Sequence, residues 1–231
     1  MSTLRNGGAA IVLTTVLGAV TAGQSDQRWT DHFGVEKGEL ASTGRNPYFV
    51  LEPGYRLTLQ DGDERLVITV LDETKVVDGV ETRVVEERES KRDALVEVSR
   101  NYYAISKRTN SVYYFGEDTD IYKDGKVVKH EGSWLAGANG ARFGLMMPGT
   151  PLVGGRYYEE IAPGVAMDRG QVASVAETMT VPAGSFTNVL RVEETTPLER
   201  GEHEYKLYAP GVGLLQDESL ELVRYGQVTG K

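Results

Sequence analysis

The sequence contains no cysteine. This absence excludes disulfides, lipid-modified cysteine, haem attachment and thiolate metal sites, so the fold has to rest on the burial of apolar side chains. Only three histidines occur in the 231 residues, which leaves few imidazole bases. The chain also lacks a Gly-x-Ser-x-Gly elbow and a complete glycine-rich phosphate-binding motif. We therefore favour a protein that is not a catalyst.

Positive charge is scarce as well. The chain has 25 lysines and arginines against 34 aspartates and glutamates, a formal net charge of −9. Without a basic field to displace counterions from phosphates, we expect no nucleic-acid partner. The negative charge is compatible with binding cations or with plain solubility. A hydrophobic content of 40% is that of an ordinary globular protein.

The N-terminus has an apolar run that is too short for a comfortable membrane span. A basic residue occurs in Met1–Arg5, small apolar residues fill Ala9–Ala22, and Val20-Thr21-Ala22 fits the small-x-small cleavage rule. This pattern predicts an export signal over residues 1–22, a mature chain without a membrane span, and a periplasmic or extracellular location. The alternative interpretation is a disordered or helical tail.

The rest of the chain divides by composition. Residues 23–45 are polar and glycine-rich, with Trp29, Phe33 and Leu40 as their substantial apolar anchors, and predict a loosely ordered leader. The pattern beyond them predicts a single β domain over residues 46–226, followed by a tail at 227–231.

Strand patterns and tight turns fill this domain. Arg65–Leu71 is β-branched and apolar on both faces, which indicates a strand covered on both sides. Asp78-Gly79 and Asp124-Gly125 each stand between two strand patterns and predict two-residue hairpin turns. Long hairpin-connected strands accumulate twist and tend to coil. We expect an all-β fold, an antiparallel barrel or strongly curved half-barrel of about ten strands.

Two C-terminal motifs carry a resemblance. Val181-Pro182-Ala183-Gly184-Ser185-Phe186 and Tyr208-Ala209-Pro210-Gly211-Val212-Gly213-Leu214-Leu215 resemble the "TPAGTF … YAPGVGLV" pattern of uncharacterised secreted bacterial β-proteins. The resemblance covers about residues 46–226. It implies a curved sheet like that of the lipoprotein carriers of the bacterial envelope. Its motifs are structural corners and carry no recognisable chemistry.

A segment rich in glycine and large apolar residues interrupts the strand pattern at Gly132–Pro151. Methionines adapt to irregular ligands, so we expect this segment to act as a lid over an apolar or amphipathic ligand in the concave side of the sheet. The candidate ligand-binding residues are Trp134, Phe143, Met146 and Met147. The alternative function is a structural or interaction scaffold that self-associates through its long hairpins. The sequence does not define the oligomeric state.

The hairpin around Asp124-Gly125 is acidic. A two-residue loop would place Asp118, Asp120 and Glu131 on one face and His130 on the other. Three carboxylates on one face predict a weak candidate calcium site within residues 117–131, and no other cofactor is indicated. The alternative is a solvated arm in which Lys129 offsets part of the charge.

The run Glu86–Asp93 is charged on both strand faces. A turn at Arg92-Asp93 would place Arg88 opposite Glu97 as a favourable cross-strand pair. Two interpretations remain open: a hairpin that projects into water and discourages edge pairing, or the wall of a polar-lined cavity.

Overall fold

The computed structural model describes residues 28–199, 201 and 203–228. The predicted export signal over residues 1–22 lies outside the described residues, as do residues 229–231 of the predicted tail. The helical structure in the described part is a single 3-10 turn, η1, at Lys37–Glu39. The regular structure is otherwise β-strand, which confirms the predicted all-β class.

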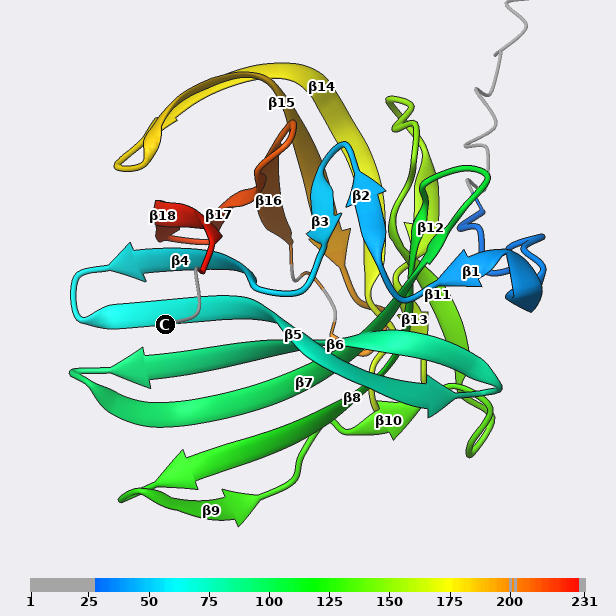
Figure 1. Ribbon diagram of the computed structural model, residues 1–231, viewed down its shortest axis with the longest axis horizontal. Coiled ribbons are helices and arrows are strands. Elements are labelled where there is room, and N and C mark those ends of the chain that lie inside the picture. Colours follow the sequence, from blue (N-terminus) through cyan, green and yellow to red (C-terminus); the bar gives the residue numbers. More distant parts are fainter. Residues whose placement is uncertain (1–27, 200, 202, 229–231) are drawn as a thin grey trace, which may run out of the picture.

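The first half of the chain forms nine strands, of which β5 is the longest in the structure (Figure 1). They are β1 (Leu40–Ala41), β2 (Gly44–Asn46), β3 (Phe49–Leu51), β4 (Tyr55–Asp61), β5 (Glu64–Val77), β6 (Val80–Lys91), β7 (Ala94–Ser106), β8 (Val112–Lys123) and β9 (Lys126–Lys129). The second half forms β10 (Trp134–Leu135), β11 (Arg142–Met147), β12 (Arg156–Tyr158), β13 (Glu160–Ile161), β14 (Arg169–Val181), β15 (Gly184–Thr195), β16 (Glu204–Ala209), β17 (Gly213–Asp217) and β18 (Leu220–Gln227).

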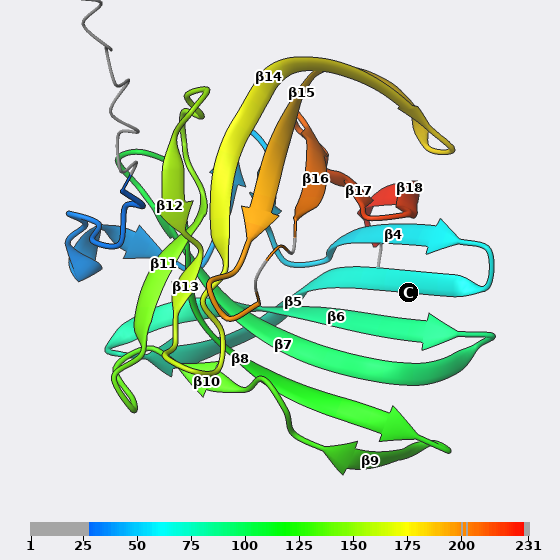
Figure 2. The same ribbon diagram turned by 180° about the vertical axis from the view of Figure 1, so that it is seen from behind.

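Thirteen of these strands follow one another around one antiparallel sheet, in the order β12-β14-β15-β16-β17-β18-β4-β5-β6-β7-β8-β11-β13. The two strands at the ends of this path, β12 and β13, are consecutive in the chain with only Glu159 between them. The sheet is therefore a nearly closed barrel, as predicted, and Figure 2 shows β11, β12 and β13 beside β14 where it closes. The expected count of about ten was approximate, since strands as short as β12 and β13 carry too few residues for a periodic pattern.

The Asp-Gly turns are confirmed. Val77 pairs with Val80 around Asp78-Gly79, and Lys123 pairs with Lys126 around Asp124-Gly125. The φ angles are 50° at Asp78, 76° at Gly79, 52° at Asp124 and 73° at Gly125. Asp and Gly tolerate this left-handed backbone, which matches the twist of the flanking strands.

The predicted pairing of Arg88 with Glu97 is wrong. The Arg92-Asp93 turn is present, but a bulge between Glu89 and Ser90 shifts the register by one residue. Arg88 consequently lies opposite Val98, and Glu89 lies opposite Glu97. The bulge thus brings two carboxylates together across the β6–β7 hairpin, where the uninterrupted ladder would have paired opposite charges.

The hairpin β2–β3 supplies apolar side chains to the interior from a direction that the main sheet does not cover (Figure 1). The Asn46 amide donates to the Pro148 carbonyl oxygen at 3.0 Å, and the Tyr48 hydroxyl donates to the Asn188 carbonyl oxygen at 3.2 Å. The ring of Phe49 packs edge-on against Tyr103, with 5.1 Å between centroids. These bonds join the hairpin to two distant parts of the barrel wall.

The described part of the predicted leader is not loosely attached. The backbone N–H of Thr30 donates to the Arg156 carbonyl oxygen at 3.0 Å, and Phe33 packs against Tyr113 with a centroid distance of 5.9 Å. Leu40 is buried in β1, which pairs with β7. The two apolar anchors bury their side chains on the barrel, and this outweighs the polar composition around them.

The glycine-rich segment Gly132–Pro151 also differs from the expectation. It does not form a separate lid, because β10 and β11 pair with β8, and β11 continues the sheet to β13. A Cβ on Gly144 would lie within 2.6 Å of the Tyr158 carbonyl oxygen, so glycine lets the backbones meet at the barrel's closure. The glycines permit close packing of strands and do not mark a mobile loop.

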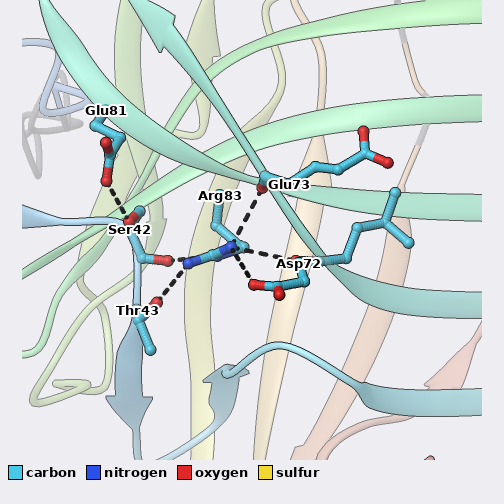
Figure 3. A network of polar contacts seen from close by, with 7 residues as sticks. Ser42, Thr43, Asp72, Glu73, Glu81 and Arg83 are labelled. Atoms are coloured by element: carbon cyan, nitrogen blue, oxygen red, sulfur yellow. Dashed lines mark hydrogen bonds and ion pairs between the residues drawn. The ribbon is translucent and has the colours of Figure 1, made fainter. Parts of the chain in front are cut away.

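A buried arginine holds a second irregular region together (Figure 3). The ladder between β5 and β6 is interrupted between Val70 and Thr74, which frees backbone carbonyls. The Arg83 guanidinium donates to two of them, those of Leu71 and Glu73, each at 3.4 Å. It also donates to the Ser42 carbonyl oxygen and the Thr43 hydroxyl at 2.9 and 2.7 Å. One side chain therefore joins the bulge in β5 to the connection between β1 and β2.

Candidate functional site

A cavity of about 270 Å³ lies inside the barrel. Its walls come from β3 to β8, from β10, β11 and β13, and from β15 to β17, so residues across most of the chain contribute. The apolar and aromatic part of the lining consists of Tyr48, Phe49, Val50, Tyr55, Leu57, Ile68, Val70, Val85, Tyr103, Tyr114, Trp134, Met146, Ala166, Tyr208, Val212, Gly213 and Leu214. The barrel therefore contains a hollow and is not packed throughout.

The alternation of side chains along β6 and β7 determines what faces this cavity. On β6 the inward residues are Val85, Glu87 and Glu89. Their exposure rises in that order, from buried to half-buried to exposed, toward the Arg92-Asp93 turn. On β7, Glu97 near the same turn is half-buried, and the inward residues beyond it are buried. Along β6 the lining thus changes from an exposed carboxylate near the turn to a buried valine, while β7 places the buried polar residues Ser99 and Asn101 beyond Glu97.

Nine carboxylates and one amine belong to the lining. The carboxylates are Glu87, Glu89, Glu97, Glu117, Glu159, Glu160, Asp168, Glu194 and Asp217, and the amine is that of Lys206. The cavity-wall interpretation of the charged run Glu86–Asp93 is therefore the one that the structure shows for Glu87 and Glu89.

Lys206 lies between carboxylates on both neighbouring strands. Its Nζ is 2.8 Å from Glu194 on β15 and 3.9 Å from Asp217 on β17. Burial by itself would lower the pKa of the Lys206 amine, but the negative charges of Glu194 and Asp217 outweigh it and hold that pKa well above its usual range. Lys206 is therefore charged, and it offsets the charge of the carboxylates nearest to it.

Glu87 and Glu117 lack such a partner. Removal from bulk water raises the pKa of Glu87 to about 8, and Lys206 opposes that rise only in part. Burial likewise raises the pKa of Glu117 to about 7. Both side chains are half-buried, since they face the hollow. Around neutral pH these two carboxyl groups are close to their titration midpoints, so a positive charge between them would deprotonate both.

Two further glutamates lie where the barrel closes. Glu159 and Glu160 are buried, and burial raises the pKa of each carboxyl group well above its usual range. The Glu160 carboxylate accepts a hydrogen bond from the Asp168 backbone N–H at 2.6 Å. Opposite them, a Cβ at Gly170 would collide with Glu159 Oε1 and come within 2.8 Å of the Tyr157 ring. Glycine at 170 leaves the space that the Glu159 side chain occupies.

Three aromatic side chains in contact with one another form one wall of the cavity. Tyr103 and Tyr114 stack with their centroids 4.8 Å apart, and Trp134 packs edge-on against Tyr114 at 5.2 Å. The Tyr114 hydroxyl donates to Asn101 Oδ1 at 2.5 Å, which fixes its ring. These three rings give the cavity a rigid side of low conformational entropy.

Two buried polar atoms of the lining have no hydrogen-bond partner among the described residues. Trp134 is 6% exposed, and its indole Nε1–H donates to no oxygen. Glu194 is 8% exposed, and its Oε1 accepts from no donor, although its other oxygen contacts Lys206. Buried polar atoms are normally paired, so both are available to a molecule in the cavity.

The structure separates the four predicted ligand-binding residues into two pairs. Trp134 and Met146 line the cavity. Phe143 faces the other side of β11, where it stacks on Phe115 with 4.8 Å between centroids, and Met147 is fully buried in the core. A bulge between Leu145 and Met147 interrupts the alternation along β11, so the sequence spacing of these residues does not by itself decide which of them face the cavity.

The predicted calcium residues are not brought together. Lys75 Nζ is 2.8 Å from Asp118, which also accepts from the Tyr102 hydroxyl, and Glu131 is 3.0 Å from Lys129. His130, expected on the opposite face, lies 2.7 Å from Asp120 because a bulge between Ile121 and Tyr122 shifts the register. Nowhere in the described ranges do three such side chains form a group that could hold a metal ion. The hairpin is a solvated arm of ion pairs.

Sequence analysis missed most of the cavity residues. Glu117, Glu159, Glu160, Glu194 and Lys206 stand in strand patterns with charge on one or both faces, and such patterns are usually solvated. The available signal was the excess of glutamate at inward-facing positions of strands that are otherwise apolar. Recognising that signal requires knowing where the bulges lie, because each bulge changes which residues face inward.

No protein-family model, no curated protein and no solved structure matches the chain significantly. The described residues include no helix that is long and apolar enough to cross a membrane. The function of the cavity has to be inferred from its own geometry.

Proposed function

We propose that this chain is a non-catalytic exported envelope protein that binds a small amphipathic molecule inside its barrel. The observation that carries the proposal is that a single cavity is lined both by apolar and aromatic side chains and by carboxylates. The location in the envelope rests on the sequence pattern of residues 1–22 and on the resemblance of the two C-terminal motifs.

The apolar side chains of the lining supply the affinity for the apolar part of such a molecule. Each Å² of apolar surface removed from water contributes about 25 cal/mol. Val70, Val85 and Leu57 present branched side chains toward the hollow from three adjacent strands. At about 270 Å³ the cavity is near the lower end of the sizes usual for ligand pockets, so a small molecule fits and a diacyl lipid does not.

The structure offers an internal reporter for this binding. The chain has two tryptophans. Trp134 lines the cavity, whereas Trp29 lies 4.6 Å from the Arg169 guanidinium in a cation–π contact and takes no part in the lining. A Trp29→Phe variant therefore leaves a single indole inside the cavity. Its emission should change on titration with short-chain amphiphiles, and native mass spectrometry should show one bound molecule per chain.

A pair of matched valines on β5 provides the control. Val70 faces the cavity, and Val76 on the same strand is 70% exposed. Val70→Phe in the Trp29→Phe background should fill the hollow and reduce amphiphile affinity at least tenfold, while Val76→Phe should leave it unchanged. Circular dichroism establishes that both variants are folded. If Val70→Phe binds as tightly as its parent, the ligand lies elsewhere and the proposal is wrong.

A further inference from the structure

The charges of the cavity point to the chemistry of its ligand. We propose that the polar end of the bound molecule is a protonated amine, held between Glu87 on β6 and Glu117 on β8. This inference rests on the proposed function, and it names the class of ligand: a small alkyl or aryl ammonium.

The first support is the concentration of carboxyl groups. When every group is counted in its ionised form, the nine carboxylates and one amine of the lining carry a formal charge of −8, close to the −9 of the whole chain. The rest of the molecule is thus nearly balanced. Burial keeps some of these carboxyl groups protonated by raising their pKa values, and a cation in the cavity would favour their ionisation. Solubility alone would spread the excess over the surface, whereas this chain concentrates it around one cavity with low-dielectric walls, which focus the field on a cation.

The second support is the absence of internal partners at one end of the cavity. Lys206 forms ion pairs with Glu194 and Asp217. In the described part of the chain no lysine, arginine or histidine lies within ion-pair distance of Glu87 or Glu117. The register places them near each other. Glu87 lies opposite Ser99, and Glu117 lies opposite Asn101 on the same strand, β7. Two carboxylates face the cavity there with only neutral side chains between them.

The third support comes from aromatic rings and from one buried oxygen without a partner among the described residues. The Trp134 ring, nine-tenths buried, lines the same cavity as those of Tyr103 and Tyr114. Aromatic faces attract organic cations, and more so where water is excluded. Glu194 adds an unpartnered buried oxygen that can accept an N–H. An ammonium has three donors and no acceptor, which suits a wall of carboxylates and rings.

The test compares three molecules that share one apolar body. Octylamine, 1-octanol and octanoate are titrated at pH 7.5 into the Trp29→Phe protein, with Trp134 emission and calorimetry as readouts. We expect octylamine to bind at least tenfold more tightly than octanol, and octanoate to bind most weakly. Equal affinities for all three, or a preference for octanoate, would overturn the amine proposal while leaving the amphiphile proposal intact. If none of the three binds, the proposed function itself fails.

Variants test the residues. Glu87→Gln and Glu117→Gln keep the shape of the side chain and remove its charge, so each should weaken octylamine at least fivefold and leave octanol within twofold. Glu131→Gln is the matched control, since the Glu131 side chain is 71% exposed on the β8–β9 arm. If octylamine binds both cavity variants as tightly as it binds the control, the ammonium does not lie between Glu87 and Glu117, and the assignment is wrong.

Discussion

At the scale of single residues, Glu87 shows a conflict between position and charge. Its carboxyl group faces a hollow in a barrel wall, without a cationic partner of its own, and its pKa is raised to about 8 by loss of hydration. An unfolded chain ionises the same group near 4.5. The folded state therefore retains a proton that the unfolded state has released between these two pH values. This residue makes the protein less stable as pH rises from about 4.5 to about 8.

Replacing Glu87 by glutamine removes this cost. At pH 4 the variant and the parent should have the same free energy of unfolding, because both carry a neutral side chain there. At pH 8.5 Glu87→Gln should be more stable by about 1–3 kcal/mol, since each pKa unit corresponds to about 1.36 kcal/mol and water in the cavity weakens the effect. Urea unfolding at the two pH values measures the difference. A variant that is less stable than the parent at pH 8.5 would show that Glu87 is ionised and paired.

Gly170 is the counterpart of Glu159 at the barrel closure. A methyl group there would meet both the Glu159 carboxylate and the Tyr157 ring, and that ring is buried. Gly170→Ala should lower the free energy of unfolding by about 1–3 kcal/mol, the usual cost of overpacking. Gly34→Ala is the control, since no atom lies within 4 Å of its Cβ position. Thermal unfolding of the two variants measures the contrast, and equal melting temperatures would contradict it.

At the scale of elements, an irregular position in a strand ladder joins parts of the fold that the regular ladders do not connect. The break in β5 between Val70 and Thr74 would leave carbonyls without partners if Arg83 did not donate to them (Figure 3). The same guanidinium holds Ser42 and Thr43. The connection between β1 and β2 and the bulge in β5 are therefore stabilised together.

In an Arg83→Met variant, the connection between β1 and β2 should no longer be held to the bulge in β5. The substitution keeps most of the apolar stem and removes every donor, so we expect a loss of about 2–4 kcal/mol in unfolding free energy, given about 1.5–3 kcal/mol for a hydrogen bond to a charged group. Hydrogen exchange should accelerate at residues 40–46 before the rest of the barrel opens. Arg65→Met, at an exposed position on the neighbouring strand β5, should cost less than 0.5 kcal/mol. Equal losses of unfolding free energy in the two variants would show that the hydrogen bonds of Arg83 do not stabilise the fold.

Hairpins and bulges also mark the boundary of what the sequence could predict. Asp78-Gly79 and Asp124-Gly125 are local signals, because their own backbone preference sets the turn, and both were predicted correctly. The bulge between Glu89 and Ser90 has no such signal, since it depends on packing inside the barrel. A shift of one residue changes each side chain's partner. For this reason the fold class followed from the sequence, while the direction of the glutamates that line the cavity did not.

At the scale of the whole molecule, the barrel gathers many ionisable groups around one cavity. The groups that line it around Glu87 are Glu89 on β6, Glu97 on β7, Glu117 on β8, Glu159 and Glu160 near β13, Glu194 on β15 and Asp217 on β17, with Lys206 on β16 as the opposing cation. Burial raises the pKa of Glu117 to about 7 and that of Glu87 to about 8. Since like charges in one cavity disfavour each other's ionisation, loss of each proton makes loss of the next harder.

This coupling predicts how the binding of a cation depends on pH. An ammonium stabilises the ionised carboxylates, so its binding releases protons, and its affinity should rise as pH increases through about 7 to 8. A primary alkylamine stays protonated in that range, as the lysine side chain does, so the change belongs to the protein. Octylamine should bind at least fivefold more tightly at pH 8.5 than at pH 6, while octanol should show no such trend.

Calorimetry in two buffers of different ionisation enthalpy counts the protons released. In Glu87→Gln/Glu117→Gln the pH dependence should flatten, because the two groups with midpoints near 7 and 8 are gone. If octylamine instead bound more tightly at pH 6, the carboxylates would not be its partners.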